Sequence, residues 1–145
     1  QVLLKNAVNT NRKKIIGFFG FNVNNFDIGE VITYDTLSYN KRDEQEADIV
    51  GGANGCYYNS DFFSNNFDKY IHSLNFKDYL CDDELIGIYF LKIGIKKKII
   101  RYSTFLKINE CAYFDYALHK NNVRERQIQT IKNCLKIMDE LITIN

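Results

Sequence analysis

The chain has 145 residues, of which 46% are hydrophobic and 14% aromatic, with 19 basic and 18 acidic side chains. This length predicts one domain with a substantial core, and the apolar content excludes an intrinsically disordered chain. The net charge of +1 provides no general attraction to nucleic acid or to an anionic membrane, and no apolar run reaches membrane-spanning length.

The first half of the chain is predicted to form a brief helix followed by short strands. Residues 1–12 have the pattern of a short helix that ends in asparagines, and residues 40–47 read as a charged, solvated connection. Apolar runs and alternating patterns predict strands. They fall at Lys14–Phe21, 31–39, Asp48–Gly52 and Gly55–Asn59. The first of these strands is interrupted by Gly17 and Gly20. The sequence SDFF at 60–63 then begins a turn or helix.

The second half is predicted to be mainly helical. Short helices are expected around Phe67–Ser73 and Phe76–Leu80, and a longer one over 82–94, with an acidic start that suits the positive end of a helix dipole. Gly94 is a suitable stop for that helix. Residues 96–103 follow as a strand with a basic lead-in, which we expect to lie at a solvated sheet edge.

The clearest element is an amphipathic helix over about 122–142. Its apolar residues recur at intervals of three and four, namely Ile128, Ile131, Leu135, Met138 and Leu141 or Ile142. Charged residues occupy the other face, so the apolar stripe is interpreted as core packing. Together the elements predict an α/β fold, a mixed sheet with flanking helices, in a single domain over residues 1–145.

The cysteines indicate a reducing compartment. Cys56, Cys81, Cys111 and Cys134 lie far apart, with neither a C-x-x-C pair nor the spacing of a zinc site. No N-x-S/T glycosylation sequon occurs either. We therefore expect a cytoplasmic protein in which cysteine acts as a small apolar residue.

One ordered series of motifs resembles a known family. A strand runs into GGANG, then an aromatic strand, SDFF, about twenty residues of small helices, and CDDELIGIYFLKIGIKKKII. Ala47–Phe63 and Asp82–Lys96 resemble the second, acceptor-side half of a glycosyltransferase with the GT-A fold, of the kind that builds surface polysaccharide or decorates glycoproteins. The resemblance covers roughly residues 14–101. It implies transfer of a sugar from a nucleotide-sugar donor to a glycan or protein-linked acceptor, and no nucleic-acid partner.

The resemblance implies roles for the acidic residues. It makes Asp83 the base that takes the proton of the acceptor hydroxyl, with Asp82 and Glu84 beside it, and such a base must lie within hydrogen-bond reach of that hydroxyl. The same residues also have an ordinary explanation, because an Asp at a helix start with a Glu two or three positions later is common capping chemistry.

The glycine-rich segment allows two interpretations as well. The resemblance implies that Gly51, Gly52, Asn54 and Gly55 line the pocket for the sugar and acceptor, with Asn54 bonding a sugar hydroxyl. Alternatively, the glycines form a tight turn or bulge between two strands. Tyr57 and Tyr58 either stack on a sugar ring or pack in a half-buried strand.

The resemblance also implies a divalent metal, Mn²⁺ or Mg²⁺, on the donor diphosphate, and makes His119 a candidate for helping to hold it. His72 has no acidic or cysteine cluster at ligand spacing and is interpreted as structural. The D-x-D motif that binds the metal in such enzymes does not occur in this chain. We therefore expect either that the nucleotide-binding half precedes Gln1 and this chain is the C-terminal part of the domain, or that the chain is a degenerate relative. A half on its own would lack donor binding, so the isolated chain is expected to be inactive.

Two other functional classes remain open. A non-catalytic carbohydrate-binding or interaction module would keep the aromatic and glycine residues without needing the acidic pair. A nucleic-acid-associated protein would use the basic stretch KIGIKKKIIR at 92–101. The first class is distinguished from the enzyme by whether Asp82 and Asp83 lie beside Gly51–Gly55 in one concave site.

Overall fold

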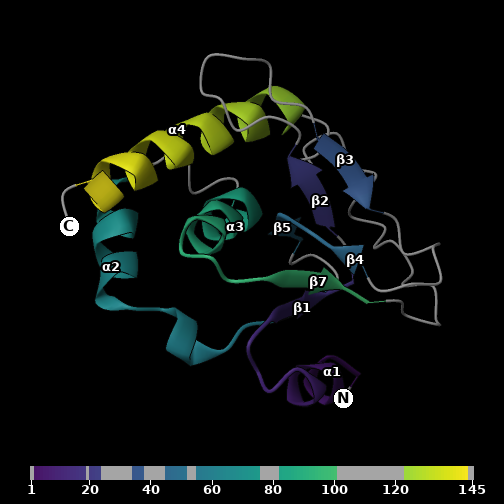
Figure 1. The fold of residues 1–145 in the computed structure, drawn as a ribbon. Helices are drawn as coiled ribbons and strands as arrows, with labels where there is room; N and C mark the ends of the chain where they lie inside the picture. The colour runs from purple at the N-terminus through teal and green to yellow at the C-terminus, as the bar shows by residue number, and fades with distance from the viewer. Residues whose placement is uncertain are drawn as a thin grey trace.

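The computed structural model describes residues 2–18, 20–23, 34–37, 45–51, 55–75, 82–100 and 123–143, and these form a mixed α/β fold (Figure 1). The helices are α1 (Val2–Asn9), the 3₁₀ turn η1 (Ser60–Phe62), α2 (Asn65–Ser73), α3 (Asp82–Lys92) and α4 (Val123–Thr143). The strands are β1 (Ile15–Gly17), β2 (Gly20–Val23), β3 (Tyr34–Leu37), β4 (Gln45–Glu46), β5 (Ile49–Val50), β6 (Cys56–Tyr57) and β7 (Lys97–Ile99). The helix predicted at 76–80 lies outside the described residues.

The strands form two small sheets. One has the order β4-β7-β1-β6, in which β1 and β7 run parallel and the outer pairs are antiparallel, so the predicted mixed sheet is confirmed. The other has the order β3-β2-β5 and is antiparallel. In the first sheet, Ile15 is opposite Lys97 and Ile16 is opposite Tyr57.

The single strand predicted over Lys14–Phe21 is wrong, because this segment contributes β1 to one sheet and β2 to the other. At the start of β2 the backbone of Gly20 lies so close to β5 that a Cβ atom would be 2.3 Å from the Ile49 carbonyl oxygen. Only glycine permits that approach. The glycines therefore mark the point where the chain changes sheets.

Alternation along β1 divides the core between two faces of the four-stranded sheet. Ile15 belongs to the larger hydrophobic cluster, which includes α3 and α4, whereas Ile16 packs with Ala7 of α1 in a smaller one. Figure 1 shows α1 beneath β1, on the side away from α3. This two-residue period is the usual consequence of strand geometry.

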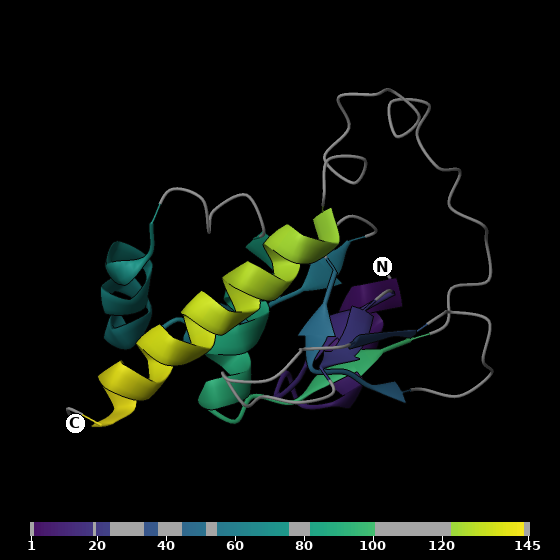
Figure 2. The ribbon, with the colours of Figure 1, turned by 90° about the horizontal axis from the view of Figure 1, so that it is seen from above.

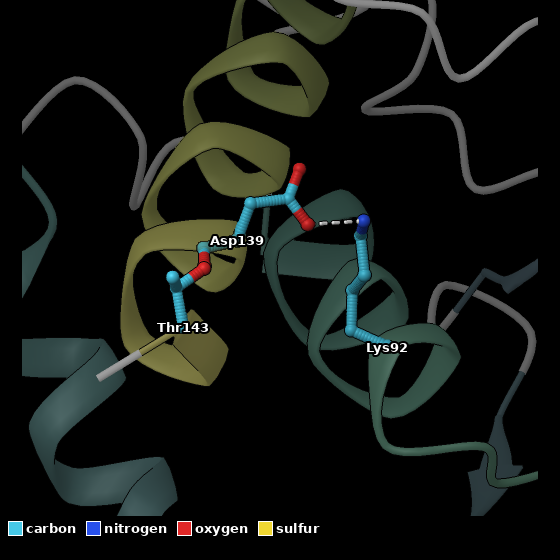
Figure 3. A network of polar contacts seen from close by, with 3 residues as sticks. All are labelled: Lys92, Asp139 and Thr143. Carbon is cyan, nitrogen blue, oxygen red and sulfur yellow. Dashed lines mark hydrogen bonds and ion pairs between the residues drawn. The ribbon is translucent and has the colours of Figure 1, made fainter. Parts of the chain in front are cut away.

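The C-terminal helix covers α3, as seen from above in Figure 2. Its predicted stripe is confirmed, since Ile131, Leu135 and Met138 are buried, while Ile142 is 51% exposed. An ion pair between Lys92 of α3 and Asp139 of α4 joins the two helices at their partly exposed ends (Figure 3). Exposed pairs of this kind add little stability, so the buried stripe holds the helices together.

Two predictions about exposure are wrong. The basic strand does not lie at a solvated edge, because β7 runs between β4 and β1 and the Lys97 residue is only 3% exposed. The connection predicted over 40–47 contains an edge strand, β4, followed by the buried Ala47. Because Glu46 of β4 pairs with Lys98 of β7, β4 covers the outer edge of this lysine-rich strand, which therefore lies in the interior of the sheet.

Candidate functional site

The candidate site begins at the first turn of α3, where three consecutive acidic side chains differ in exposure. Asp82 is exposed, Asp83 is half-buried and Glu84 is only 2% exposed. Negative charge is favoured at this end of a helix by its unbonded N–H groups. The predicted acidic start is therefore confirmed, and the three carboxyl groups are held in three different environments.

Glu84 is the most perturbed of these groups. Burial raises the pKa of its carboxyl to about 7, the charges of Asp83 and Asp82 raise it further, and hydrogen bonds with its own backbone and with Gln127 of α4 lower it. Its Oε1 atom has no hydrogen-bond partner among the described residues. A buried carboxyl with an unsatisfied oxygen is held more easily in its protonated form. Its burial could not be inferred from the sequence, which shows only three acids in a row.

The charges of the acidic turn, the first turn of α3 with Asp82, Asp83 and Glu84, act on side chains in and next to β6. Burial raises the pKa of the Cys56 thiol, a hydrogen bond with Tyr58 opposes that shift, and the charges of Asp83 and Asp82 add to it. Burial likewise raises the pKa of the Tyr58 hydroxyl, reinforced by Cys56 and by the same two carboxylates. The two aspartates are therefore electrostatic neighbours of the strand that follows the glycine-rich segment.

The described ends of the glycine-rich segment are both constrained. Gly51 is buried at the end of β5, and Gly55, with φ of +88°, occupies the left-handed region that favours glycine. On the α3 side, a Cβ atom on Gly87 would lie 2.8 Å from Ile49, so the helix packs directly on β5. Gly52 and Asn54 lie outside the described residues. The Gly51 end of the segment thus follows the strand on which α3 packs, whereas Gly55 lies beside Leu3 of α1.

Aromatic rings form a wall around Phe90, in the second half of α3. Tyr58 stacks on Phe90 with ring centres 5.8 Å apart, and Phe63 meets Phe90 edge-on at 5.1 Å. Phe63 also contacts Phe67 at 4.8 Å and is 38% exposed, so part of this wall reaches solvent. The packing interpretation of Tyr58 is consistent with these contacts. Phe63 was not singled out in the sequence, because an aromatic residue at a turn is ordinary there.

Of the two histidines, only His72 belongs to the described residues, and it lies in α2. Nδ1 of His72 lies 2.7 Å from the Asp68 carbonyl oxygen in the preceding turn of α2, which fits its predicted structural role. His119 lies outside the described residues. Among those that are described, no three or more His, Cys, Asp or Glu side chains are grouped so as to hold a metal ion.

Comparisons of the chain with protein-family models, with curated proteins and with solved structures found no match. None of the helices in the described part of the chain has both the length and the apolar character required to cross a membrane. The functional argument consequently rests on the residues themselves.

Proposed function

We propose that the chain is a glycosyltransferase, or the acceptor-side part of one, that moves a sugar from a nucleotide-sugar to a glycan or protein-linked acceptor. Asp83 is the base of this reaction, and Asp82 and the glycine-rich segment bind the reacting groups. The observation that carries the proposal is that the charges of Asp82 and Asp83 act on Cys56 and Tyr58, which closely follow Gly55 in the chain. This interaction connects the glycine-rich segment with the acidic start of α3, the two motifs whose order in the sequence resembles that of the GT-A family.

In an inverting transfer, the acceptor oxygen forms a bond with the anomeric carbon while the bond from that carbon to the nucleotide diphosphate breaks. The leaving diphosphate takes the bonding electron pair, and the proton of the acceptor hydroxyl passes to the Asp83 carboxylate. Asp83 suits this role because the residue is only half-buried and lies beside Asp82 in the first turn of α3. Glu84 is too buried to meet an acceptor and supports the helix start instead.

A second function is favoured by the partly exposed Phe63. A partly exposed aromatic ring is also a means of binding a sugar without reacting with it, as in a carbohydrate-binding module. This alternative requires the ring of Phe63 but not a carboxylate at position 83. Substitution of Asp83 therefore distinguishes the two functions, because only the glycosyltransferase requires its carboxylate.

The test compares Asp83→Asn and Asp83→Ala with the wild-type chain, assayed together with any upstream half. Nucleotide release from a panel of nucleotide-sugars is measured in the presence of acceptor, alongside thermal melts. Asn keeps the size of the side chain but cannot take the proton, so turnover is expected to fall by about 10²- to 10⁴-fold with little change in the melt. Asp61→Asn, an exposed acid in η1, is the matched control and is expected to leave turnover unchanged.

A helix-capping role predicts the opposite pattern. Because Asn caps a helix about as well as Asp, turnover would survive Asp83→Asn, whereas Asp83→Ala would cost roughly 0.5–2 kcal/mol of stability. Near-full turnover in Asp83→Asn would exclude Asp83 as the base. If no form of the protein consumes a nucleotide-sugar, while glycan binding is lost in Phe63→Ala, the binding module is the better description.

A further inference from the structure

A second candidate site lies at the opposite end of α3. A cavity of about 410 Å³ opens between the last residues of this helix, the edge of β2 and the start of β7. Leu91 and Ile95 contribute apolar walls, and Asn22, Asp48 and Lys97 contribute polar groups. Because α3 has 11 residues, the cavity is roughly 15 Å along the helix from Asp82. It is therefore separate from the acidic turn.

Lys97 is the most deeply buried charged residue in the lining of this cavity. It projects from the same face of β7 as Ile99, which is the face that α3 covers. The residue is 3% exposed, and no carboxylate lies within 4 Å of its amine among the described residues. A lysine that is both buried and without an ion-pair partner is rare, because burial of an unpaired charge is unfavourable.

The charged groups around Lys97 limit what the cavity can bind. The charge of Asp48 acts on Lys97, but the Oδ2 atom of Asp48 already accepts a hydrogen bond of 2.8 Å from the Val23 N–H. Glu46 at the rim pairs with Lys14 and Lys96, each at 3.7 Å. The helix end contributes partial negative charge as well. This mixture favours neither a phosphate nor a free cation, whereas a neutral polar molecule is compatible with it.

Burial changes the state of the Lys97 amine. It lowers the pKa from 10.5 to about 8, and the charge of Asp48 opposes that shift. About a tenth of such an amine is neutral at pH 7, compared with less than one part in a thousand for an ordinary lysine. The neutral amine is the nucleophilic form, and desolvation of this kind is how proteins prepare lysines for reaction with carbonyl compounds.

We propose that this cavity is a second small-molecule site, at which the amine of Lys97 condenses with the carbonyl group of a small aldehyde or ketone. The nitrogen forms a bond with the carbonyl carbon, and the carbonyl oxygen leaves as water with the two amine hydrogens, so the product is an imine. Asp48, which is also in the cavity, is placed to transfer the protons. The apolar walls hold the carbon chain of the ligand, and the step needs no oxidant or reductant.

The experiment uses propanal as the probe and sodium cyanoborohydride to trap the imine. The folded wild-type protein is treated at pH 7, and the modified lysines are located and quantified by tandem mass spectrometry of peptides. The adjacent Lys96, 68% exposed at its side chain, and Lys98 of the same strand serve as internal controls. Lys97 is expected to react at least tenfold faster than either. Its rate should also rise with pH and level off about one pH unit above the pKa of about 8, where the neutral fraction approaches one.

The same measurement in urea gives the second comparison. Once the chain is unfolded, the three adjacent lysines should react at similar rates, because the environment that distinguishes Lys97 is gone. If folded Lys97 reacts no faster than Lys96 and Lys98, or more slowly than in urea, its burial is only protective and the proposal is overturned. The result does not depend on whether any variant folds, and it is independent of the glycosyltransferase assay.

Discussion

Among the residues of the acidic turn, Glu84 differs most from what its sequence context indicates. Asp82, Asp83 and Glu84 are consecutive acids, and local sequence offers no means to separate them. Their exposures differ because α4, whose Gln127 bonds Glu84, packs over this turn from more than forty positions later in the chain. The acidic helix start could thus be predicted from the sequence, whereas the burial of one carboxyl depends on a distant element.

The raised pKa of Glu84 predicts a pH-dependent stability. Since the folded pKa is about 7 and the ordinary value is 4.5, the folded chain holds one more proton than the unfolded chain between those values. The contribution of this group to stability is therefore present below about pH 4.5 and is lost as the pH rises through 7. The difference corresponds to roughly 3 kcal/mol, at 1.4 kcal/mol per pH unit.

Glu84→Gln tests this dependence, because Gln keeps the shape of the side chain and carries no charge. The free energies of unfolding of the wild type and the variant are measured in urea from pH 5 to pH 8. The wild type should lose stability relative to Glu84→Gln as the pH increases. A constant difference across that range would show that Glu84 is not held in its protonated form.

At the scale of elements, the helices agree with the sequence better than the strands do. The amphipathic period of α4 follows from local residues, and so do the acidic start of α3 and its stop at Gly94, with φ of +77°. The division of Lys14–Phe21 into β1 and β2 depends on the approach of β5 to Gly20, which no local pattern reveals. The interior position of β7 likewise depends on its pairing with β4 and β1. The lysine-rich sequence of this strand, taken alone, therefore led to the prediction of an exposed edge.

The stripe of α4 predicts a large effect of truncation at its centre. Leu135 is fully buried in the main cluster, so Leu135→Ala should destabilise the fold by about 2–5 kcal/mol through lost burial and the cavity that remains. Ile142 is 51% exposed on the same helix, and Ile142→Ala is expected to change stability by less than about 0.5 kcal/mol. Chemical denaturation of the two variants checks both values. Equal effects would mean that α4 is not docked through its central residues.

At the scale of the whole molecule, α3 connects the two candidate sites. Its first turn holds the acidic residues near β6, its middle packs on Ile49 through Gly87, and its last residues line the cavity around Lys97. The order of the motifs in the sequence led to the first site. The second was missed, because burial of Lys97 and the cavity arise only when β2, β7 and α3 come together.

The division of β1 between two hydrophobic clusters has a consequence for how the protein opens. Ile15 and Ile16 face opposite sides of the sheet, so the strand cannot separate from its neighbours without exposing both clusters. We expect its amide protons to exchange with deuterium only through global unfolding, as slowly as those of Ile88 at the centre of α3. Hydrogen exchange measured by NMR tests this, and faster exchange in β1 would mean that α1 and this strand detach as a separate unit. Slow exchange at both places would identify a single cooperative unit that extends from the N-terminal helix to α3.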